Sequence, residues 1–504
     1  MPVRFWFPAT GLLAKQEGFF FGENTMIFHS YSKTCAFSSI EAIRDKHITI
    51  MGLGLNGGGE AAVKFFLKKG AYVLATDMKS QKDLQPTIDR LSADKEIDTS
   101  RLTYRLGEHR IEDFEKADCV IKNPGVKYQG NKYLAAAKAI ETDLSIFLRF
   151  TDCPIIAVTG SKGKSSTVSA IYFGLKEAGY KTFLGGNITV SPLTFFDQVN
   201  QDTPVVIEFS SWQLADLRGR KVLKPHISII TKIVPDHQNW YGNMEDYVAD
   251  KRLIYADQDK GDYSIFDAGP DQEGTGPKCG GSWGDLFARE SKATVLRYDA
   301  DNPRYDLGKL LVPGKHMRTN AQNAALVMQL MNIDKDRIKE ILQRWPGIDH
   351  RLQYFHSWTN KKGTNYKFYN DTCATVPEAA AAATQAFEKP VTLLTGGTDK
   401  GLELHKLTEV LINPDKKSIP VKDIYLLEGS ASNKITSDLE NAKVKYKGPY
   451  SSLKEMLKNL RSDLEEKDGK EEIVVFSPGA TSFGMFANEF DRGNQFMQEI
   501  KELF

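Results

Sequence analysis

Short apolar runs, glycine-rich turns and amphipathic segments alternate along most of the chain. The first series has an apolar strand at His47–Met51, a turn at Gly52–Gly57 and a helical pattern from Ala61 to Lys69. Further strands are predicted at Ala71–Asp77 and Cys119–Ile121. Strands and helices that alternate at this spacing predict a parallel sheet covered by helices on both faces.

The same pattern recurs twice towards the C-terminus. The later strands are also short apolar runs, predicted at Ile155–Val158, Pro204–Glu208, Ile227–Ile230, Val391–Leu394, Asp423–Leu427 and Glu472–Phe476. A helix is predicted at about residues 320–331. Residues 268–283, which are rich in Gly, Pro and charge, predict a surface insertion.

Composition then narrows the class of protein. The 504 residues carry 66 Lys and Arg against 65 Asp and Glu, a net charge of +1, so electrostatics give no reason to expect nucleic acid or a membrane as partner. No apolar run approaches the length of a membrane-spanning helix. The five cysteines are odd in number and contain no C-x-x-C pair, which argues against a disulfide scaffold or a thiolate zinc site. We expect a cytoplasmic monomer.

The segment Thr159–Ser166 carries the strongest chemical signal. It joins an apolar strand to a helix, and such a turn directs backbone N–H groups and the helix dipole at an anion. The usual spacing of a phosphate loop needs glycine where Val158 stands, so this is the shorter T-G-x-x-G-K-S. The residues expected to bind ATP here are Gly160, Ser161, Lys162, Gly163, Lys164, Ser165 and Ser166.

A second glycine pattern opens the first series. Gly52-x-Gly54-x-x-Gly57, with Asp77 at the end of the next strand, fits the dinucleotide-binding fingerprint. Two nucleotide sites in succession indicate either a dehydrogenase joined to an ATPase or an ATP-dependent enzyme whose substrate carries a nucleotide. The spacing of the residues does not decide between them.

Together these patterns predict an α/β protein with three consecutive domains. The predicted parts are an N-terminal extension of no assigned role at 1–46, a Rossmann-like domain at 47–152, a central P-loop ATPase-type domain at 153–346 and a C-terminal Rossmann-like domain at 347–504.

Motifs in a fixed order show that residues 47–504 resemble the Mur ligases. Those motifs are Gly52-Leu53-Gly54-Leu55, Val158–Ser165, Gly185-Gly186-Asn187-Ile188, Glu208–Leu214, Pro235-Asp236-His237, Lys251–Tyr255, His350-Arg351, Asn370-Asp371, Gly396–Lys400, Ser477-Pro478, Ser482 and Arg492-Gly493-Asn494. The resemblance implies that the first domain holds a uridine nucleotide, the second ATP and the third an amino acid.

The reaction that the resemblance implies is addition of D-glutamate to UDP-N-acetylmuramoyl-L-alanine during synthesis of the peptidoglycan precursor. The substrate carboxylate attacks the γ-phosphate of ATP, and the amine of glutamate attacks the resulting acyl phosphate. Three alternatives stay open: L-glutamate in place of D-glutamate, another acceptor, or a catalytically silent nucleotide-binding protein.

Site residues follow from the same resemblance. It implies two Mg²⁺ ions, with Ser165 and Glu208 at the first, His237 at the second, and Lys251 as a carbamylated lysine that offers the oxygen ligand Mg²⁺ prefers. Lys164, Glu208, His237 and Lys251 are the expected catalytic residues.

The remaining expected contacts are assigned by ligand. They are Asn320, Arg351 and Asp371 for ATP; Leu55, Asn56, Asp77, Gly125 and Asn187 for the UDP-muramoyl substrate; and Thr375, Lys400 and Ser482 for the carboxylates of glutamate. Three residues depart from the family pattern: Met317 near the adenine helix, Cys373 in place of a lysine, and Glu489 in place of a phenylalanine.

Overall fold

The computed structural model describes residues 36–188, 190–413 and 420–504. Within these residues no helix is both long and apolar enough to cross a membrane. The chain divides into two compact units: residues up to Arg304 with Leu326–Ile333, and Tyr305–Ala325 with Asp334–Phe504. Most of the predicted extension, residues 1–35, lies outside the described residues.

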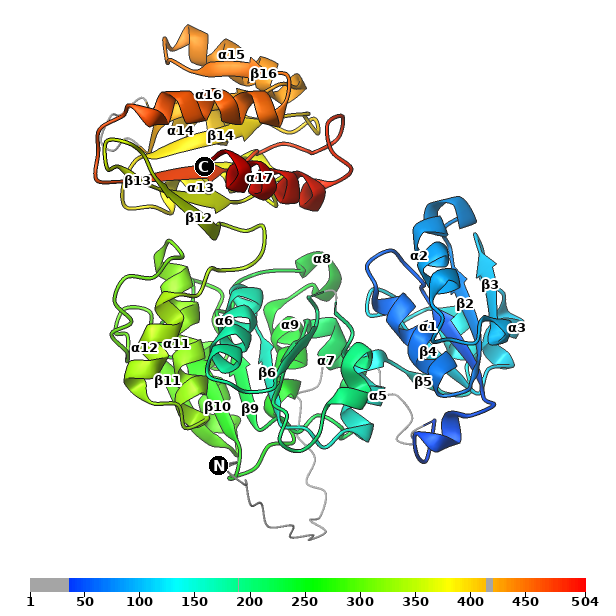
Figure 1. The fold of residues 1–504 in the computed structure, drawn as a ribbon. Helices are drawn as coiled ribbons and strands as arrows, with labels where there is room; N and C mark the ends of the chain where they lie inside the picture. The colour runs from blue at the N-terminus through cyan, green and yellow to red at the C-terminus, as the bar shows by residue number, and fades with distance from the viewer. Residues whose placement is uncertain (1–35, 189, 414–419) are drawn as a thin grey trace. The chain divides into compact units, whose positions relative to one another are not determined.

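The first sheet is parallel throughout and has the strand order β3-β2-β1-β4-β5 (Figure 1). Its strands are β1 (His47–Met51), β2 (Tyr72–Asp77), β3 (Leu102–Leu106), β4 (Cys119–Lys122) and β5 (Ile140–Glu141). Its helices are α1 (Gly58–Lys68), α2 (Gln81–Ala93), α3 (Ile111–Glu115), α4 (Lys132–Ala136) and α5 (Asp143–Phe150), with 3₁₀ turns at Glu41–Ile43 and Thr99–Arg101. The strand order reverses between β1 and β4, and ligands of such sheets bind at the carboxyl ends of strands at this point.

The second sheet, also parallel, has the order β11-β10-β9-β6-β8-β7. Its strands are β6 (Ile155–Thr159), β7 (Phe183–Gly186), β8 (Val205–Glu208), β9 (Ile227–Ile230), β10 (Tyr263–Asp267) and β11 (Thr294–Tyr298). Its helices are α6 (Lys164–Glu177), α7 (Ser211–Leu217), α8 (Gln238–Tyr241), α9 (Met244–Lys251) and α10 (Trp283–Glu290), with 3₁₀ turns at Pro192–Gln198 and Arg252–Tyr255. Strands β6, β8 and β9 are buried along their whole length, as parallel strands covered on both faces must be.

The second unit contains the third sheet, in the order β12-β13-β17-β14-β15-β16. Its strands are β12 (Gln353–Thr359), β13 (Asn365–Asn370), β14 (Val391–Gly396), β15 (Val421–Leu427), β16 (Lys447–Tyr450) and β17 (Glu471–Phe476). The helices of this part of the chain are α11 (Lys315–Leu330), which the boundary between the units crosses, α12 (Lys335–Gln343), α13 (Pro377–Gln385), α14 (His405–Ile412), α15 (Ser430–Asn441), α16 (Leu453–Glu465) and α17 (Glu489–Leu503). The edge strand β12 is antiparallel to β13.

The first two sheets share one hydrophobic core within the first unit. The Phe65 and Phe196 rings meet at a centroid distance of 5.1 Å, and those of Phe147 and Phe195 at 5.6 Å. The buried pair Arg220–Glu141, at 2.7 Å, joins the same two sheets. The first sheet is therefore packed on the second by apolar and charged contacts.

The predicted α/β class with parallel sheets is confirmed, while the three domain boundaries stay predictions. Each apolar run predicted as a strand forms one, with ends that differ by at most two residues. Strands such as β7 and β12 went unpredicted because they are partly exposed and lack a continuous apolar run. The predicted insertion 268–283 ends in the core, since Trp283 is 3% exposed and donates from Nε1 to the Thr275 carbonyl at 2.7 Å.

Candidate functional site

The phosphate loop is held against the end of β9. Gly160 has a φ of 141°, and a Cβ there would lie 1.9 Å from Thr231 Oγ1, so only glycine fits. The amides of Ser161 and Lys162 donate to the Lys232 carbonyl at 3.0 and 3.2 Å. Gly163, in the left-handed region, caps α6, whose first turn begins with Lys164, Ser165 and Ser166. The free N–H groups of that first turn form a site for an anion.

The Lys164 ammonium folds back over this loop. Its Nζ donates to the carbonyls of Gly160 and Ser161 at 3.1 and 3.0 Å. Burial lowers the pKa of Lys164, while the nearby Glu208 and Asp236 carboxylates act in the opposite direction. The amine thus lies beside the loop, close to two carboxylates.

Glu208 ends the buried strand β8 and is 1% exposed. Its Oε1 accepts a hydrogen bond from Asn187 Nδ2 at 3.1 Å. Its Oε2 is buried and has no hydrogen-bond partner within the part of the chain that the structure describes. A buried carboxylate oxygen without a partner is unfavourable, so Glu208 fits a site completed by a cation. Asn187, expected at the substrate, lies against this carboxylate.

Lys251 ends α9 and is 1% exposed. Its Nζ donates to the Gly160 carbonyl at 2.8 Å and lies 4.5 Å from the centroid of the Tyr247 ring. Burial, with the neighbouring Lys164, holds the pKa of Lys251 well below its usual value, although the Asp236, Asp250 and Glu208 carboxylates oppose the shift. The structure therefore brings together Lys164, Glu208 and Lys251; their catalytic role stays a prediction.

His237 lies on the loop that follows β9 and precedes α8. It has a φ of 51°, its side chain is 44% exposed, and its ring centroid lies 4.9 Å from that of Trp212. Its Nε2 is 3.9 Å from Asp236 Oδ2. No group of three His, Cys, Asp or Glu side chains able to hold a metal gathers within the described ranges. A metal ion here would need oxygen from Ser165, phosphate or water as well.

The expected substrate residues of the first sheet divide into two kinds. Asp77 is 8% exposed, and its two oxygens accept from the amides of Gly54 and Lys79, each at 2.9 Å. Asp77 therefore shapes the glycine turn. Leu55, Asn56 and Gly125 are exposed at the carboxyl ends of β1 and β4, where a ligand has access to them.

In the second unit, three loops meet at the carboxyl ends of adjacent strands. The Gly479 amide donates to the Ala374 carbonyl at 2.9 Å, and the Thr481 amide donates to the Thr398 carbonyl at 3.0 Å. These bonds set side by side the loops that carry Thr375, Lys400 and Ser482. Lys400 is exposed, Thr375 is half-buried and Ser482 is buried.

Asp371 follows β13 and is 7% exposed. It accepts from Ser477 Oγ at 2.6 Å and from the Leu352 amide at 3.0 Å. Burial raises the pKa of Asp371 to about 7 despite these bonds and the nearby charge of Arg351. Arg351 itself is exposed, while Asn320 in α11 is buried with its Nδ2 3.9 Å from Met317 Sδ.

Similarity to known proteins agrees with this geometry. The Mur ligase MurD-like N-terminal domain matches residues 46–144, and the Mur ligase middle domain matches residues 158–273. UDP-N-acetylmuramoylalanine–D-glutamate ligase of Treponema pallidum is 36% identical over 92% of this chain and 98% of its own length. The protein of that name from Borreliella burgdorferi is 37% identical over 92% of this chain and 99% of its own. This chain belongs to the Mur ligase family.

A solved Mur ligase structure shares the fold. UDP-N-acetylmuramate-alanine ligase MurC from Thermotoga maritima has a TM-score of 0.52 and 17% identity, over 91% of this chain and 99% of that one. At this identity the likeness concerns the fold alone.

The sequence analysis assigned no role to three residues that the structure places at the site of this Mur ligase. Asp236 lies near both Lys164 and Lys251, and its position beside His237 was the available signal. Tyr247 lies one helical turn before Lys251 and donates to Ser161 Oγ at 3.0 Å. Arg492, 1% exposed, donates to Thr372 Oγ1 and to the carbonyls of Thr372 and Ala480 at 2.9 to 3.0 Å, which ties two of the three loops together.

Two of the departures from the family pattern, Cys373 and Glu489, lie near Arg492. The half-buried Cys373 donates its amide to the His350 carbonyl at 3.1 Å. The Glu489 carbonyl accepts from Thr372 Oγ1 at 2.9 Å, and the exposed Phe490 ring lies 5.6 Å from that of His350. Phe490 thus presents an aromatic ring one residue after position 489, where the family pattern has a phenylalanine.

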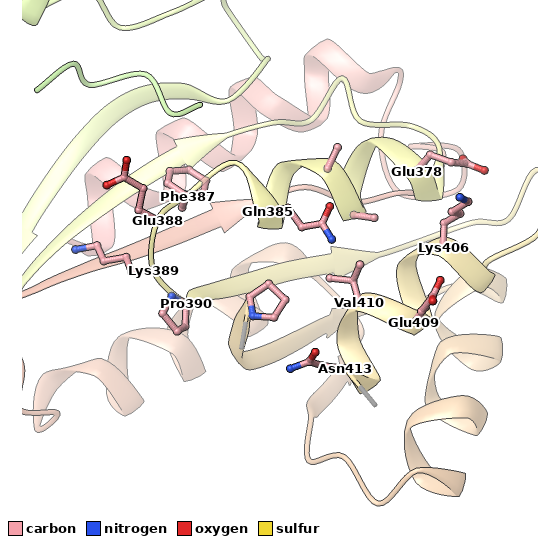
Figure 2. A pocket seen from close by; sticks show the side chains of 13 residues that line it. Glu378, Gln385, Phe387, Glu388, Lys389, Pro390, Lys406, Glu409, Val410 and Asn413 are labelled. Atoms are coloured by element: carbon pink, nitrogen blue, oxygen red, sulfur yellow. The ribbon is translucent and has the colours of Figure 1, made fainter. Parts of the chain in front are cut away.

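A separate hollow of about 710 Å³ lies between α13 and α14 (Figure 2). Pro390, which lines it, precedes β14, whereas the loop that carries Lys400 follows the strand. The hollow therefore runs along α13 and α14 to the amino end of β14, away from the loop that carries Lys400.

Proposed function

We propose that this Mur ligase uses ATP to join D-glutamate to UDP-N-acetylmuramoyl-L-alanine in the synthesis of the peptidoglycan precursor. The observation that carries the proposal is that half-buried Lys164 and buried Lys251 both donate to the Gly160 carbonyl of the phosphate loop, with the buried Glu208 carboxylate near both amines. Its support from similarity is that two relatives above 35% identity, aligned over nearly their whole length, are named for this activity.

The protein's part in the reaction is mainly electrostatic. The first-turn amides of α6 bind the phosphates, and Lys164 neutralises the charge that develops on the transferring γ-phosphoryl group. The carboxylate of the UDP-linked substrate becomes an acyl phosphate, which the glutamate amine then attacks. Phosphorylation replaces an oxide leaving group with phosphate, so the amide can form.

Magnesium would be held by the Ser165 hydroxyl and by Glu208 Oε2, which has no hydrogen-bond partner among the described residues. When bound, Mg²⁺ offsets negative charge on the phosphates. His237 is our proposed ligand for a second ion. We also propose that Lys251 is carbamylated, since its depressed pKa favours the uncharged amine that adds CO₂. The product is an oxygen ligand of the kind Mg²⁺ prefers.

The remaining assignments complete the proposal. Residues 47–152 would bind the UDP-linked substrate through the exposed turns that carry Leu55, Asn56 and Gly125, with Asp77 behind them. Residues 153–346 would bind ATP, and residues 347–504 would bind glutamate. The residues proposed for ATP and glutamate in the later part are Asn320, Arg351 and Asp371, and Thr375, Lys400 and Ser482, respectively. The protein would act as a cytoplasmic monomer.

The test is phosphate release from purified protein with ATP, Mg²⁺ and UDP-N-acetylmuramoyl-L-alanine, in parallel with D-glutamate, L-glutamate or no amino acid. Of the three conditions, we expect phosphate release only with D-glutamate. The Lys164→Met variant should lose this release. Lys176→Met, an exposed substitution in the last turn of the same helix, is the matched control and should keep full activity. The proposal would be contradicted if phosphate were released with L-glutamate and not with D-glutamate. It would also be contradicted if no phosphate were released with either amino acid.

A further inference from the structure

Lys122, the last residue of β4, is a buried cation that the proposed function does not use. Its side chain is 2% exposed, and its Nζ lies 2.8 Å from Asp216 Oδ2 on α7. The same Nζ donates to the carbonyls of Val126 at 2.9 Å and Asn123 at 3.2 Å. One ammonium thus closes the turn Asn123–Val126 and ties it to the second sheet.

This turn stands where the topology of the first sheet predicts a ligand. It follows β4 directly, next to β1 at the point where the strand order reverses. The Asn123 side chain also accepts from the Gly125 amide at 3.1 Å, and Gly125 is exposed. The turn therefore has a fixed inner side and an open outer side.

The turn and the residue after it contact two segments of the second sheet's domain, and each of these segments follows a proposed metal ligand. Helix α7, which carries Asp216, begins three residues after Glu208. Just beyond the turn, Lys127 Nζ lies 4.5 Å from the centroid of the Trp240 ring. Trp240 is three residues after His237. A hollow of about 90 Å³ lies between these parts and is lined on both sides, by Lys122 and Lys127 and by Asp216 and Trp240.

We propose that Lys122 is a positioning residue for the UDP-linked substrate. It sets the turn Asn123–Val126 relative to α7, so that a nucleotide bound on the turn directs the far carboxylate of the substrate towards the phosphate loop. A buried ion pair is poor support for stability but is suited to fixing one geometry. This role rests on the proposed function and adds to it a residue that touches no substrate.

The decisive variant is Lys122→Met, which keeps the length of the side chain and removes its charge. Lost bonds from a charged donor should raise the Kd for UDP-N-acetylmuramoyl-L-alanine about 10- to 100-fold. The KM for ATP and for D-glutamate, and kcat at saturation, should change less than about threefold, since the phosphate loop is untouched. Titration calorimetry without ATP gives the Kd, and phosphate release gives the kinetic constants.

The buried pair Arg220–Glu141 offers a matched control. Both side chains are 1% exposed and join the same two sheets. Arg220 donates to Glu141 and to the backbone carbonyls of Asp216 and Ile140, and Glu141 also accepts from the Ser145 hydroxyl and the Ala36 amide. These bonds do not involve the turn Asn123–Val126. Arg220→Met should lower Tm as Lys122→Met does, and it should leave the Kd for the UDP-linked substrate unchanged. If Lys122 had a merely structural role, Lys122→Met and Arg220→Met would change the Kd for the UDP-linked substrate to the same extent.

Asp216→Asn keeps the proposal testable if Lys122→Met does not fold. It preserves the bonds from Lys122 to the two turn carbonyls and weakens the link to α7, so we expect a Kd rise of about three- to tenfold. Wild-type affinity in every variant that folds, Lys122→Met or Asp216→Asn, would overturn the role of Lys122. Failure of the wild-type protein to bind the UDP-linked substrate would instead overturn the proposed function, and this role with it.

Discussion

Two buried acids lie at the carboxyl ends of strands in different sheets, and the hydrogen-bond partners of their oxygens differ. Asp371, after β13, has both oxygens occupied by hydrogen bonds from Ser477 and Leu352. Glu208, at the end of β8, has one oxygen bonded to Asn187, while the other has no hydrogen-bond partner in the described ranges. Burial raises the pKa of Asp371 to about 7. The amines of Lys164 and Lys251 lie near Glu208.

This difference separates a carboxyl group that the fold satisfies from one that needs an external cation. Glu208 is the last residue of the apolar strand β8, whereas Asp371 follows β13, whose sequence is Asn-Tyr-Lys-Phe-Tyr-Asn. Neither pattern shows how the oxygens of the acid are bonded. Only the groups that the fold places around each oxygen tell them apart. Substitutions that remove charge and keep shape should therefore act on catalysis at Glu208 and on stability at Asp371.

Glu208→Gln should have the largest effect. Loss of the negative charge at the phosphate loop removes the proposed magnesium ligand, and we expect kcat to fall about 100- to 1000-fold with the fold intact. Asp371→Asn should lower kcat less than about tenfold, because both its oxygens are already engaged by the protein. Phosphate release at saturating Mg²⁺, with circular dichroism as a check of folding, measures both. Equal losses would remove the distinction between the two acids.

Lys251→Ala tests whether the amine beside Glu208 becomes an anion by carbamylation. We expect activity to fall about 100-fold, since an oxygen ligand and a buried side chain are lost. A small carboxylate such as acetate should enter the space and restore activity about tenfold if an anion is the working form. Methylammonium, of similar size and opposite charge, is the control. Restoration by methylammonium and not by acetate would show that the amine itself acts.

The sequence predicted the central site better than the other parts. The positions of Glu208 and Lys251 beside the phosphate loop were expected only from the resemblance to the Mur ligases. The loop itself was predictable because strand, turn and helix follow one another there within a few residues. Asp236 and Arg492 were not, because their roles depend on which distant loops the sheets bring together. The buried state of Lys122 was also hidden, since its partner Asp216 lies 94 residues away on another sheet.

A pH effect on stability should belong to Asp371. Its pKa is raised from 3.8 to about 7 in the folded protein, so between these values the folded state holds a proton that the unfolded chain has lost. The free energy of unfolding near β13 should therefore fall as pH rises, by about 2 kcal/mol from pH 5 to pH 7. Hydrogen exchange of the β13 amides measures it, and Asp371→Asn should remove this dependence. The same pH slope in both proteins would contradict the assignment.

The smallest effect should come from the neutral donors that hold the two acids. Asn187→Ala removes the 3.1 Å bond to Glu208 Oε1, and the less firmly held carboxylate should raise the Mg²⁺ concentration for half-maximal activity about tenfold. Ser477→Ala removes the matching 2.6 Å bond to Asp371 Oδ2 and should leave the Mg²⁺ dependence unchanged. Both are measured at saturating UDP-linked substrate, because Asn187 is also a proposed substrate contact. If the Mg²⁺ dependence moved with Ser477→Ala and not with Asn187→Ala, the metal would belong to Asp371, and the comparison between the two acids would be reversed.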